Sequence, residues 1–180
     1  NLKNNKEIIL LNKAIGNFEG EIDLNIEEKN NGQSNSILKP LKHLEQYPDI
    51  KFEKKERVKM IKLNSLHLNA EYNFLNIDIQ GYELEALKGA NELLDEIDVI
   101  ICEINREELY ENCPNYKDIS NYLKKFGFKL VEKRWIGGSW GDGLYLKKDL
   151  TLIQKISSRI LNLIYSNNHL INKILGKLFN

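Results

Sequence analysis

The chain of 180 residues has only two cysteines, three prolines and no excess of either charge. Cys102 and Cys113 are too few for a disulfide framework or for zinc-ligand spacing. Basic and acidic residues both number 26, so the net charge of +0 argues against a general nucleic-acid binder. No apolar stretch approaches the roughly 20 residues that span a bilayer. We therefore expect a soluble protein of a reducing, cytoplasmic compartment.

The sequence also lacks the short motifs of several enzyme classes. It contains no GxxxxGK[ST] phosphate loop, no GxGxxG between a strand and a helix, and no GxSxG elbow. His67 and His169 have no partners that suggest metal ligation, so no metal site is expected. These absences argue against a P-loop enzyme and a dinucleotide oxidoreductase.

The composition is that of one globular domain, with 42% apolar and 29% charged residues. Its charge is uneven, because no acidic residue follows Asp149 while four basic residues do. This shift predicts a boundary between a body of residues 1–149 and a tail of residues 150–180.

The tail carries apolar residues at helical spacing in Leu150–Tyr165 and again in Leu170–Phe179. Both segments are predicted to be amphipathic helices with lysine or arginine on the polar side. Two roles stay open. The helices dock on the body or on a second subunit of a homo-oligomer, or they contact a membrane surface.

The centre of the chain indicates an α/β fold. Phe74–Ile79 and Val99–Ile104 are nearly continuous apolar runs, typical of parallel strands covered on both faces. Tyr82–Leu94 between them has helical periodicity, so the three segments form a βαβ unit. Gly89 inside that helix is expected to allow close packing of the helix on the sheet.

Weaker patterns flank this unit. Glu7–Asn12 is a short apolar run that predicts a buried strand. Alternating residues predict two strands that pair as an antiparallel ribbon, Glu21–Ile26 and Arg57–Leu63. Further along, a helix is expected from Tyr116 to Phe126, followed by two antiparallel strands at Phe128–Lys133 and Leu144–Lys147.

Two acids stand where the central strands end. Asp78 and Glu103 occupy equivalent places on successive strands, and ligands of open α/β sheets bind at that edge. Such a pair can hold a substrate hydroxyl or act as a general base. Alternatively, each acid accepts hydrogen bonds from backbone amides. For His43 and Trp140 the sequence leaves a ligand contact and an ordinary surface or packing role both open.

Several of these segments resemble one family when they are taken together. Asn76–Ala90 (NIDIQGYELEALKGA) followed by Val99–Glu103 (VIICE) resembles the signature of FkbM-type methyltransferases. Three further pieces agree in order: KAIG at 13–16, QSNSILKPLKHLEQYP at 33–48 and WGDGLYLK at 140–147. The resemblance covers about Ile8 to Lys148.

The resemblance implies a class I methyltransferase-like (Rossmann-like) three-layer sandwich. Its sheet would be mostly parallel and end in an antiparallel hairpin, with C-terminal helices added. It also implies an O-methyltransferase that uses S-adenosylmethionine (SAM) and acts on a hydroxyl of a sugar, glycan or natural product. The transfer would need alignment and a base for the hydroxyl proton.

Site residues carried over by position fall into three groups. The catalytic residues would be Asp78, Glu103 and His43. The cofactor would contact Asn12, Ala14, Asp78 and Ile79. The substrate would contact Gln80, Glu83, Ser36 and Trp140. No metal is implied by these positions.

The family's glycine-rich donor-binding segment has no counterpart in these residues. We therefore expect a methyltransferase domain truncated at its N-terminus, which binds SAM poorly by itself and exposes an unpaired sheet edge. The alternative is a catalytically inert module that kept the fold and serves in protein interactions.

Overall fold

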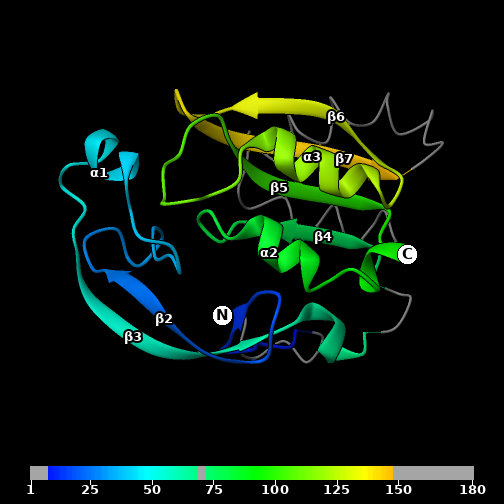
Figure 1. Ribbon diagram of the computed structural model, residues 1–180, viewed down its shortest axis with the longest axis horizontal. Helices are drawn as coiled ribbons and strands as arrows, with labels where there is room; N and C mark the ends of the chain where they lie inside the picture. Colours follow the sequence, from blue (N-terminus) through cyan, green and yellow to red (C-terminus); the bar gives the residue numbers. More distant parts are fainter. Residues whose placement is uncertain (1–7, 69–71, 148–180) are drawn as a thin grey trace.

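The computed structural model describes residues 8–68 and 72–147, and these form two sheets with short helices (Figure 1). One sheet has three strands in the order β1-β3-β2, which span Ala14–Ile15, Phe52–Ile61 and Gly20–Glu27. The other has four strands in the order β4-β5-β7-β6, which span Phe74–Ile77, Val99–Asn105, Trp140–Lys147 and Phe128–Trp135.

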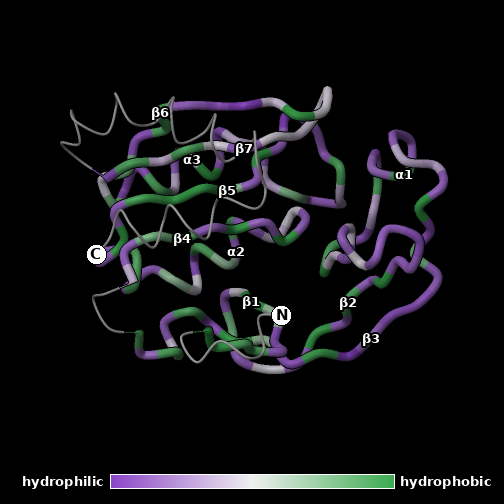
Figure 2. The backbone as a smooth tube through the Cα atoms, turned by 180° about the vertical axis from the view of Figure 1, so that it is seen from behind, coloured by the Kyte–Doolittle hydropathy of each residue, from purple (hydrophilic) through white to green (hydrophobic). Residues whose placement is uncertain are grey.

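β2 and β3 form a long ribbon that curves away from the four-stranded sheet (Figure 1). The two strands run antiparallel with Ile22 opposite Val58, which confirms the predicted ribbon. The long connection between them contains the short helix α1, Lys42–Gln46. β3 is largely hydrophilic whereas β5 is hydrophobic along most of its length (Figure 2). The ribbon is therefore an arm beside the core, as its alternating pattern indicates.

The strand predicted at Glu7–Asn12 is wrong for the residues of this segment that the structure describes. Residues 8–12 form no strand, and the side chains of Ile9, Leu10 and Leu11 are 73%, 55% and 47% exposed. Glu7 lies outside the described residues. A strand needs a neighbour to pair with its backbone groups, and no described strand pairs with residues 8–12. An apolar run is therefore not enough to produce a strand here.

The four-stranded sheet contains the predicted βαβ unit and hairpin. β4 pairs with β5 in parallel, and β6 pairs with β7 antiparallel, as expected. β7 also lies between β5 and β6 and runs antiparallel to both. The prediction of a mostly parallel sheet is therefore wrong, because both sheets are mixed. A tight hairpin reverses the chain, so placing β7 inside the sheet adds two antiparallel pairings.

The crossover helix is shorter than predicted. α2 covers Glu83–Lys88, and a separate 3-10 turn, η3, covers Leu93–Asp95. Gly89 ends α2, and a Cβ at this position would overlap the carbonyl oxygen of Gly16. Gly89 thus allows close packing, but against the turn after β1 and not against the sheet. A second 3-10 turn, η2 at Leu63–Leu66, is tied to this place by a hydrogen bond from Asn64 to the Gly89 carbonyl.

The second helix, α3, spans Tyr116–Lys124 and confirms the prediction to within two residues at its end. Asn115 and Asp118 form a reciprocal capping box at its start. Gly127 follows its end with a φ of +86°, the left-handed conformation that glycine adopts without strain.

The main core lies between the sheet and the two helices α2 and α3, which cover one face of it (Figure 1). Ile100, Cys102 and Ile104 of β5 point into this core and are fully buried. Leu144 and Leu146 belong to a smaller apolar cluster with Val99, Ile101 and Val131, which by strand alternation lies on the other face. In residues 8–68 and 72–147 the packed helices α2 and α3 share one face, so the three-layer sandwich stays a prediction. The predicted tail helices lie outside the described residues.

Candidate functional site

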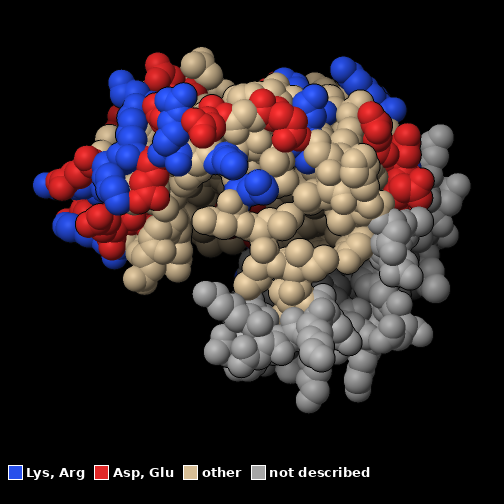
Figure 3. Space-filling model, turned by 90° about the horizontal axis from the view of Figure 1, so that it is seen from below, with Lys and Arg blue, Asp and Glu red and all other residues tan. Residues whose placement is uncertain are grey.

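A cavity of about 1030 Å³ lies between the ribbon and the carboxyl ends of β4 and β5. Its walls come from the segment around β1, the connection between β2 and β3, the middle of β3, and the ends of β4 and β5. Seen from below, the molecule is hollowed between the charge-rich ribbon and the main body (Figure 3). The cavity therefore lies at the sheet edge where the sequence places Asp78 and Glu103.

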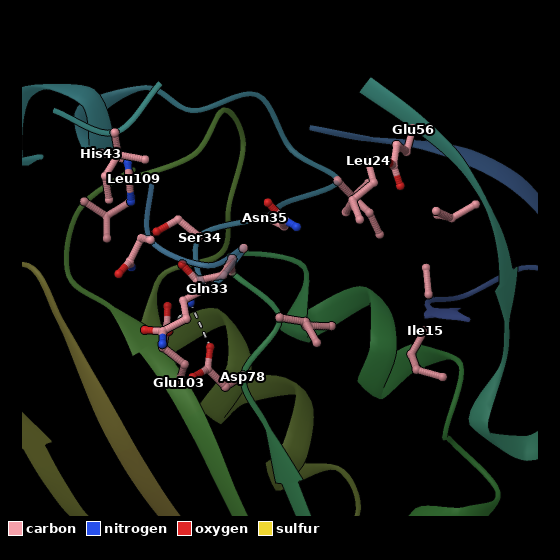
Figure 4. Close-up of a pocket in the computed structure, with 18 of the residues that line it drawn as sticks. Ile15, Leu24, Gln33, Ser34, Asn35, His43, Glu56, Asp78, Glu103 and Leu109 are labelled. Carbon is pink, nitrogen blue, oxygen red and sulfur yellow. Dashed lines mark hydrogen bonds between the residues drawn. The ribbon is translucent and has the colours of Figure 1, made fainter. Parts of the chain in front are cut away.

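The structure brings these two acids together, as predicted. Asp78 directly follows β4, and Glu103 lies near the end of β5. The side-chain nitrogen Nε2 of Gln80 donates to Oδ1 of Asp78 and to Oε2 of Glu103, both at 2.8 Å (Figure 4). Asp78 is exposed to the cavity, whereas Glu103 is only 4% exposed. The two carboxyl groups thus face one hollow with an amide between them.

Glu103 is the more perturbed of the two acids. Burial raises the pKa of the Glu103 carboxyl well above its usual range, and the nearby negative charges of Glu83 and Asp78 act in the same direction. A hydrogen bond with Asp78 adds to this effect. Glu103 therefore holds a proton near neutral pH and can donate it to a neighbouring oxygen.

A third acid, Asp142, was missed by the sequence analysis. It lies on β7 directly opposite Glu103 of β5, and Arg134 of β6 lies opposite it on the other side. Burial raises the pKa of Asp142 to about 6, with Asp78 adding to the rise and Arg134 opposing it. The last strand was predicted to begin at Leu144, whereas β7 begins at Trp140 and includes Asp142. Only the cross-strand register reveals this row of charged side chains.

Glu83 lies beneath the turn that carries Gln80. Its Oε1 accepts hydrogen bonds from the backbone nitrogens of Ile79 and Gly81 at 3.1 and 3.0 Å. The side chain is fully buried, and its other oxygen has no hydrogen-bond partner in the part of the chain that the structure describes. Burial raises the pKa of Glu83 to about 7, although these backbone hydrogen bonds oppose the rise. The structure thus places Glu83 under the turn and not among the residues that line the cavity.

Ser36 connects the long β2–β3 connection to the same turn. Its hydroxyl donates to the carbonyl oxygen of Gln80 at 2.6 Å and accepts from the backbone nitrogen of Leu38. Ser36 is fully buried, while its neighbours Ser34 and Asn35 line the cavity. Residues of this connection line the cavity, and Ser36 fixes the connection to the turn after β4.

His43 lies in α1 and lines the cavity from above the acids (Figure 4). Its ring centre is 5.0 Å from that of Tyr47, 5.3 Å from that of Tyr110 and 5.6 Å from that of Phe52. The side chain is 3% exposed, and its buried Nδ1 has no hydrogen-bond partner among the described residues. Burial lowers the pKa of His43, so the imidazole is neutral near pH 7.

The two tryptophans have different surroundings. Trp140 lines the cavity, and its Nε1 donates to the hydroxyl of Tyr47 at 2.8 Å. Trp135 packs beneath the guanidinium of Arg106, which is 3.9 Å from the ring centre, and meets Tyr116 edge-on. Of the two, only Trp140 is placed to contact a ligand in this cavity.

The remaining predicted residues meet across the cavity. Asn12 and Ala14 line it from the side of β1, and Ile79 lines it from the end of β4. The apolar side chains of Ile15 and Leu24 also line the cavity (Figure 4). The predicted cofactor residues therefore share one cavity although they come from the two different sheets.

Two kinds of feature are missing from the described part of the chain. Residues 8–68 and 72–147 contain no group of three or more side chains arranged to hold a metal ion. Within the same residues, no helix has the length and hydrophobicity needed to cross a membrane.

A model of the methyltransferase FkbM domain matches residues 1–130. The chain belongs to the FkbM methyltransferase family. The searches of curated proteins and of solved structures gave no match. The FkbM match contains Asp78, Gln80 and Glu103, so the family's domain includes the acids at the centre of this cavity. Trp140 and Asp142 lie beyond the matched residues.

Proposed function

We propose that this FkbM protein is a SAM-dependent O-methyltransferase acting on a hydroxyl of a sugar, glycan or natural product. The observation that carries the proposal is the pairing of Asp78 and Glu103 in the lining of a cavity, in a chain of a methyltransferase family. An aromatic side chain, Trp140, and a neutral histidine, His43, line the same cavity. This combination suits an acceptor that is ring-shaped and rich in hydroxyl groups.

The residues present fit the methyl donor. The cavity of about 1030 Å³ is at the upper end of the size of small-molecule sites, which leaves room for a donor and an acceptor. Asn12, Ala14, Asp78 and Ile79 would hold SAM between the two sheets, with the carboxylate of Asp78 balancing its positive charge. SAM when bound supplies an electrophilic methyl group on a sulfonium sulfur.

The chain's own residues would then orient the acceptor and remove its proton. Protonated Glu103 can donate a hydrogen bond to one acceptor oxygen, and Trp140 offers a face for the ring. The hydroxyl proton passes to Asp78, which is exposed to the cavity, whereas Nδ1 of His43 is itself buried. The different surroundings of the side chains determine these roles. Burial keeps Glu103 protonated, so that it can donate a hydrogen bond, and keeps His43 neutral.

Calorimetry with SAM and with S-adenosylhomocysteine tests the donor directly, using protein expressed from its complete reading frame. We expect dissociation constants on the order of 1–100 μM, and at least about tenfold weaker binding by Asp78→Asn. Asp95→Asn is the matched control, since Asp95 is exposed at the opposite end of β5. It should bind as the wild type does.

No heat of binding for either compound at protein concentrations of about 100 μM would reject the donor. That result would favour the inert interaction module instead. If the donor binds, incubation with SAM and a panel of sugars and glycans should give new O-methyl signals in NMR spectra. Methylation at nitrogen or carbon only would reject the O-methyltransferase.

A further inference from the structure

The side-chain amide of Gln80 is bound at both ends. Its Nε2 donates to Asp78 and Glu103, and its Oε1 accepts from the hydroxyl of Tyr110 at 2.9 Å. Its backbone is held as well, because the φ of +55° belongs to a tight turn and Ser36 binds its carbonyl oxygen. Gln80 is therefore a fixed link between two acids and a tyrosine.

An amide of this kind can turn by 180°, which exchanges its oxygen and nitrogen. With two ionised carboxylates the turned amide would be repelled, because its oxygen would face theirs. Glu103 holds a proton, however, and can donate it to the oxygen of a turned Gln80. Of the two acids, only Asp78 therefore disfavours the turned amide. A hydrogen-bond donor at the opposite end strengthens this preference.

Tyr110 is that donor. It is fully buried, and among residues 8–68 and 72–147 its hydroxyl has one other hydrogen-bond partner, the carbonyl oxygen of Ser34 at 3.2 Å. Burial raises the pKa of the Tyr110 hydroxyl, so it keeps its proton throughout the working range of pH. Its backbone pairs with Pro40, and its ring lies 5.3 Å from that of His43. The Tyr110 hydroxyl is thus held in place by the β2–β3 connection, which contains Pro40 and lines the cavity.

We propose that Tyr110 is a positioning residue that holds the Gln80 amide in the one orientation in which its nitrogen bridges Asp78 and Glu103. The inference rests on the proposed function, in which Asp78 contacts SAM and Glu103 contacts the hydroxyl compound that is methylated. Without the hydroxyl, only Asp78 opposes the turned amide, so the amide turns more often and the two carboxyl groups lose their common partner when it does. Asp78 is then no longer held in a fixed position beside SAM, the methyl donor.

The first test measures the Gln80 amide itself. Hydrogen exchange of the Gln80 side-chain protons is followed by NMR at pH 7 without added ligand, and Gln80→Met identifies their signals by their loss. We expect Tyr110→Phe to speed this exchange at least about tenfold. Tyr145→Phe is the matched control, because Tyr145 is also fully buried and its hydroxyl, 3.1 Å from that of Ser120, lies away from the cavity. It should change the exchange less than about twofold.

The second test measures SAM binding by calorimetry. Tyr110→Phe should weaken it about three- to tenfold, and Tyr145→Phe should leave it unchanged. Unchanged exchange at Gln80 in Tyr110→Phe, or an equal rise in Tyr145→Phe, would overturn the proposal. So would faster exchange with unaltered SAM affinity, because Tyr110 would then have a structural role only.

Should Tyr110→Phe fail to fold, a fluorotyrosine placed at position 110 keeps the proposal testable. Its hydroxyl is a stronger donor in the same place, so the Gln80 protons should exchange more slowly than in the wild type. Equal or faster exchange would contradict the proposed role. If the wild-type protein binds no SAM, the proposed function fails by itself, while exchange at Gln80 still decides what Tyr110 does.

Discussion

Replacing Glu83 by glutamine should remove part of the loss of stability that buried acids cause between mildly acid and neutral pH. Glu83 is completely buried, and the structure supplies partners for only one of its two oxygens. Burial raises its pKa from the ordinary 4.5 to about 7. The carboxyl group is therefore neutral in the folded state at pH values where it is ionised in the unfolded chain.

The sign and size of the effect follow from this difference. Because the folded-state pKa lies above the unfolded value, the folded state binds more protons between pH 4.5 and about 7. The contribution to stability is fully present below pH 4.5 and is lost as the pH rises to about 7. Each unit of pKa is worth about 1.4 kcal/mol, so the loss amounts to about 3 kcal/mol.

Urea unfolding from about pH 5 to about pH 8 measures this loss in the wild type and in Glu83→Gln. The amide accepts the same backbone hydrogen bonds but does not ionise, so its curve of stability against pH should be flatter by up to about 3 kcal/mol. The slope is compared and not the absolute stability, because the new amide nitrogen lacks a partner and costs about 1–3 kcal/mol at every pH. The raised pKa of Glu103 also contributes to the loss, and because the charge of Glu83 is one cause of that rise, the substitution reduces this contribution as well.

Glu85→Gln serves as the control, since it removes a negative charge from the same first turn of α2 without touching the buried pair of backbone hydrogen bonds. Its curve should run parallel to that of the wild type. The reasoning is refuted if wild type and Glu83→Gln lose stability in parallel over this range. Glu83 would then be ionised in the folded protein despite its burial.

Two further substitutions test how the site is supported. Gly89→Ala should lower the melting temperature by several degrees, because a Cβ would overlap the carbonyl oxygen of Gly16 and overpacking costs about 1–3 kcal/mol. Gly138→Ala, where a Cβ meets nothing within 4 Å, should leave it unchanged, and equal effects would count against the close approach. Asn115→Ala should cost about 1 kcal/mol in urea unfolding through loss of the capping box. The exposed Asn121→Ala in the same helix should cost much less, and a comparable loss would deny the cap its role.

The periodicity of apolar residues was sufficient to predict the strands and the helix whose formation depends mainly on nearby residues. The alternation of Glu21–Ile26 and the apolar runs around Asp78 and Glu103 predicted strands that the structure contains. The helical periodicity after Asn115 predicted α3. The position of the two acids at strand ends then followed from the parallel pairing of β4 and β5, which a βαβ unit imposes.

Features that depend on distant neighbours were not predictable in this way. Ile9 and its neighbours have the composition of a strand, but no described strand pairs with them. Gly89 interrupts a helical pattern because of a turn more than 70 positions earlier in the chain, at Gly16. Asp142 joins the site through the register of β7 against β5, which no spacing within WGDG reveals. Each case requires knowledge of the tertiary contact.

The turn from Asp78 to Glu83 shows why the two kinds of information combine at the site. Its sequence marks the place, since an acid at a strand end followed by Gly81 indicates a tight turn with a function. Its roles are assigned by contacts from elsewhere: Tyr110 binds the side chain of Gln80, and Ser36 binds its backbone. Sequence analysis treated Gln80 as one of several substrate contacts. In the structure Gln80 contacts both acids as well as Tyr110 and Ser36, so we expect substitutions at Tyr110 or Ser36 to change the chemistry inside the cavity.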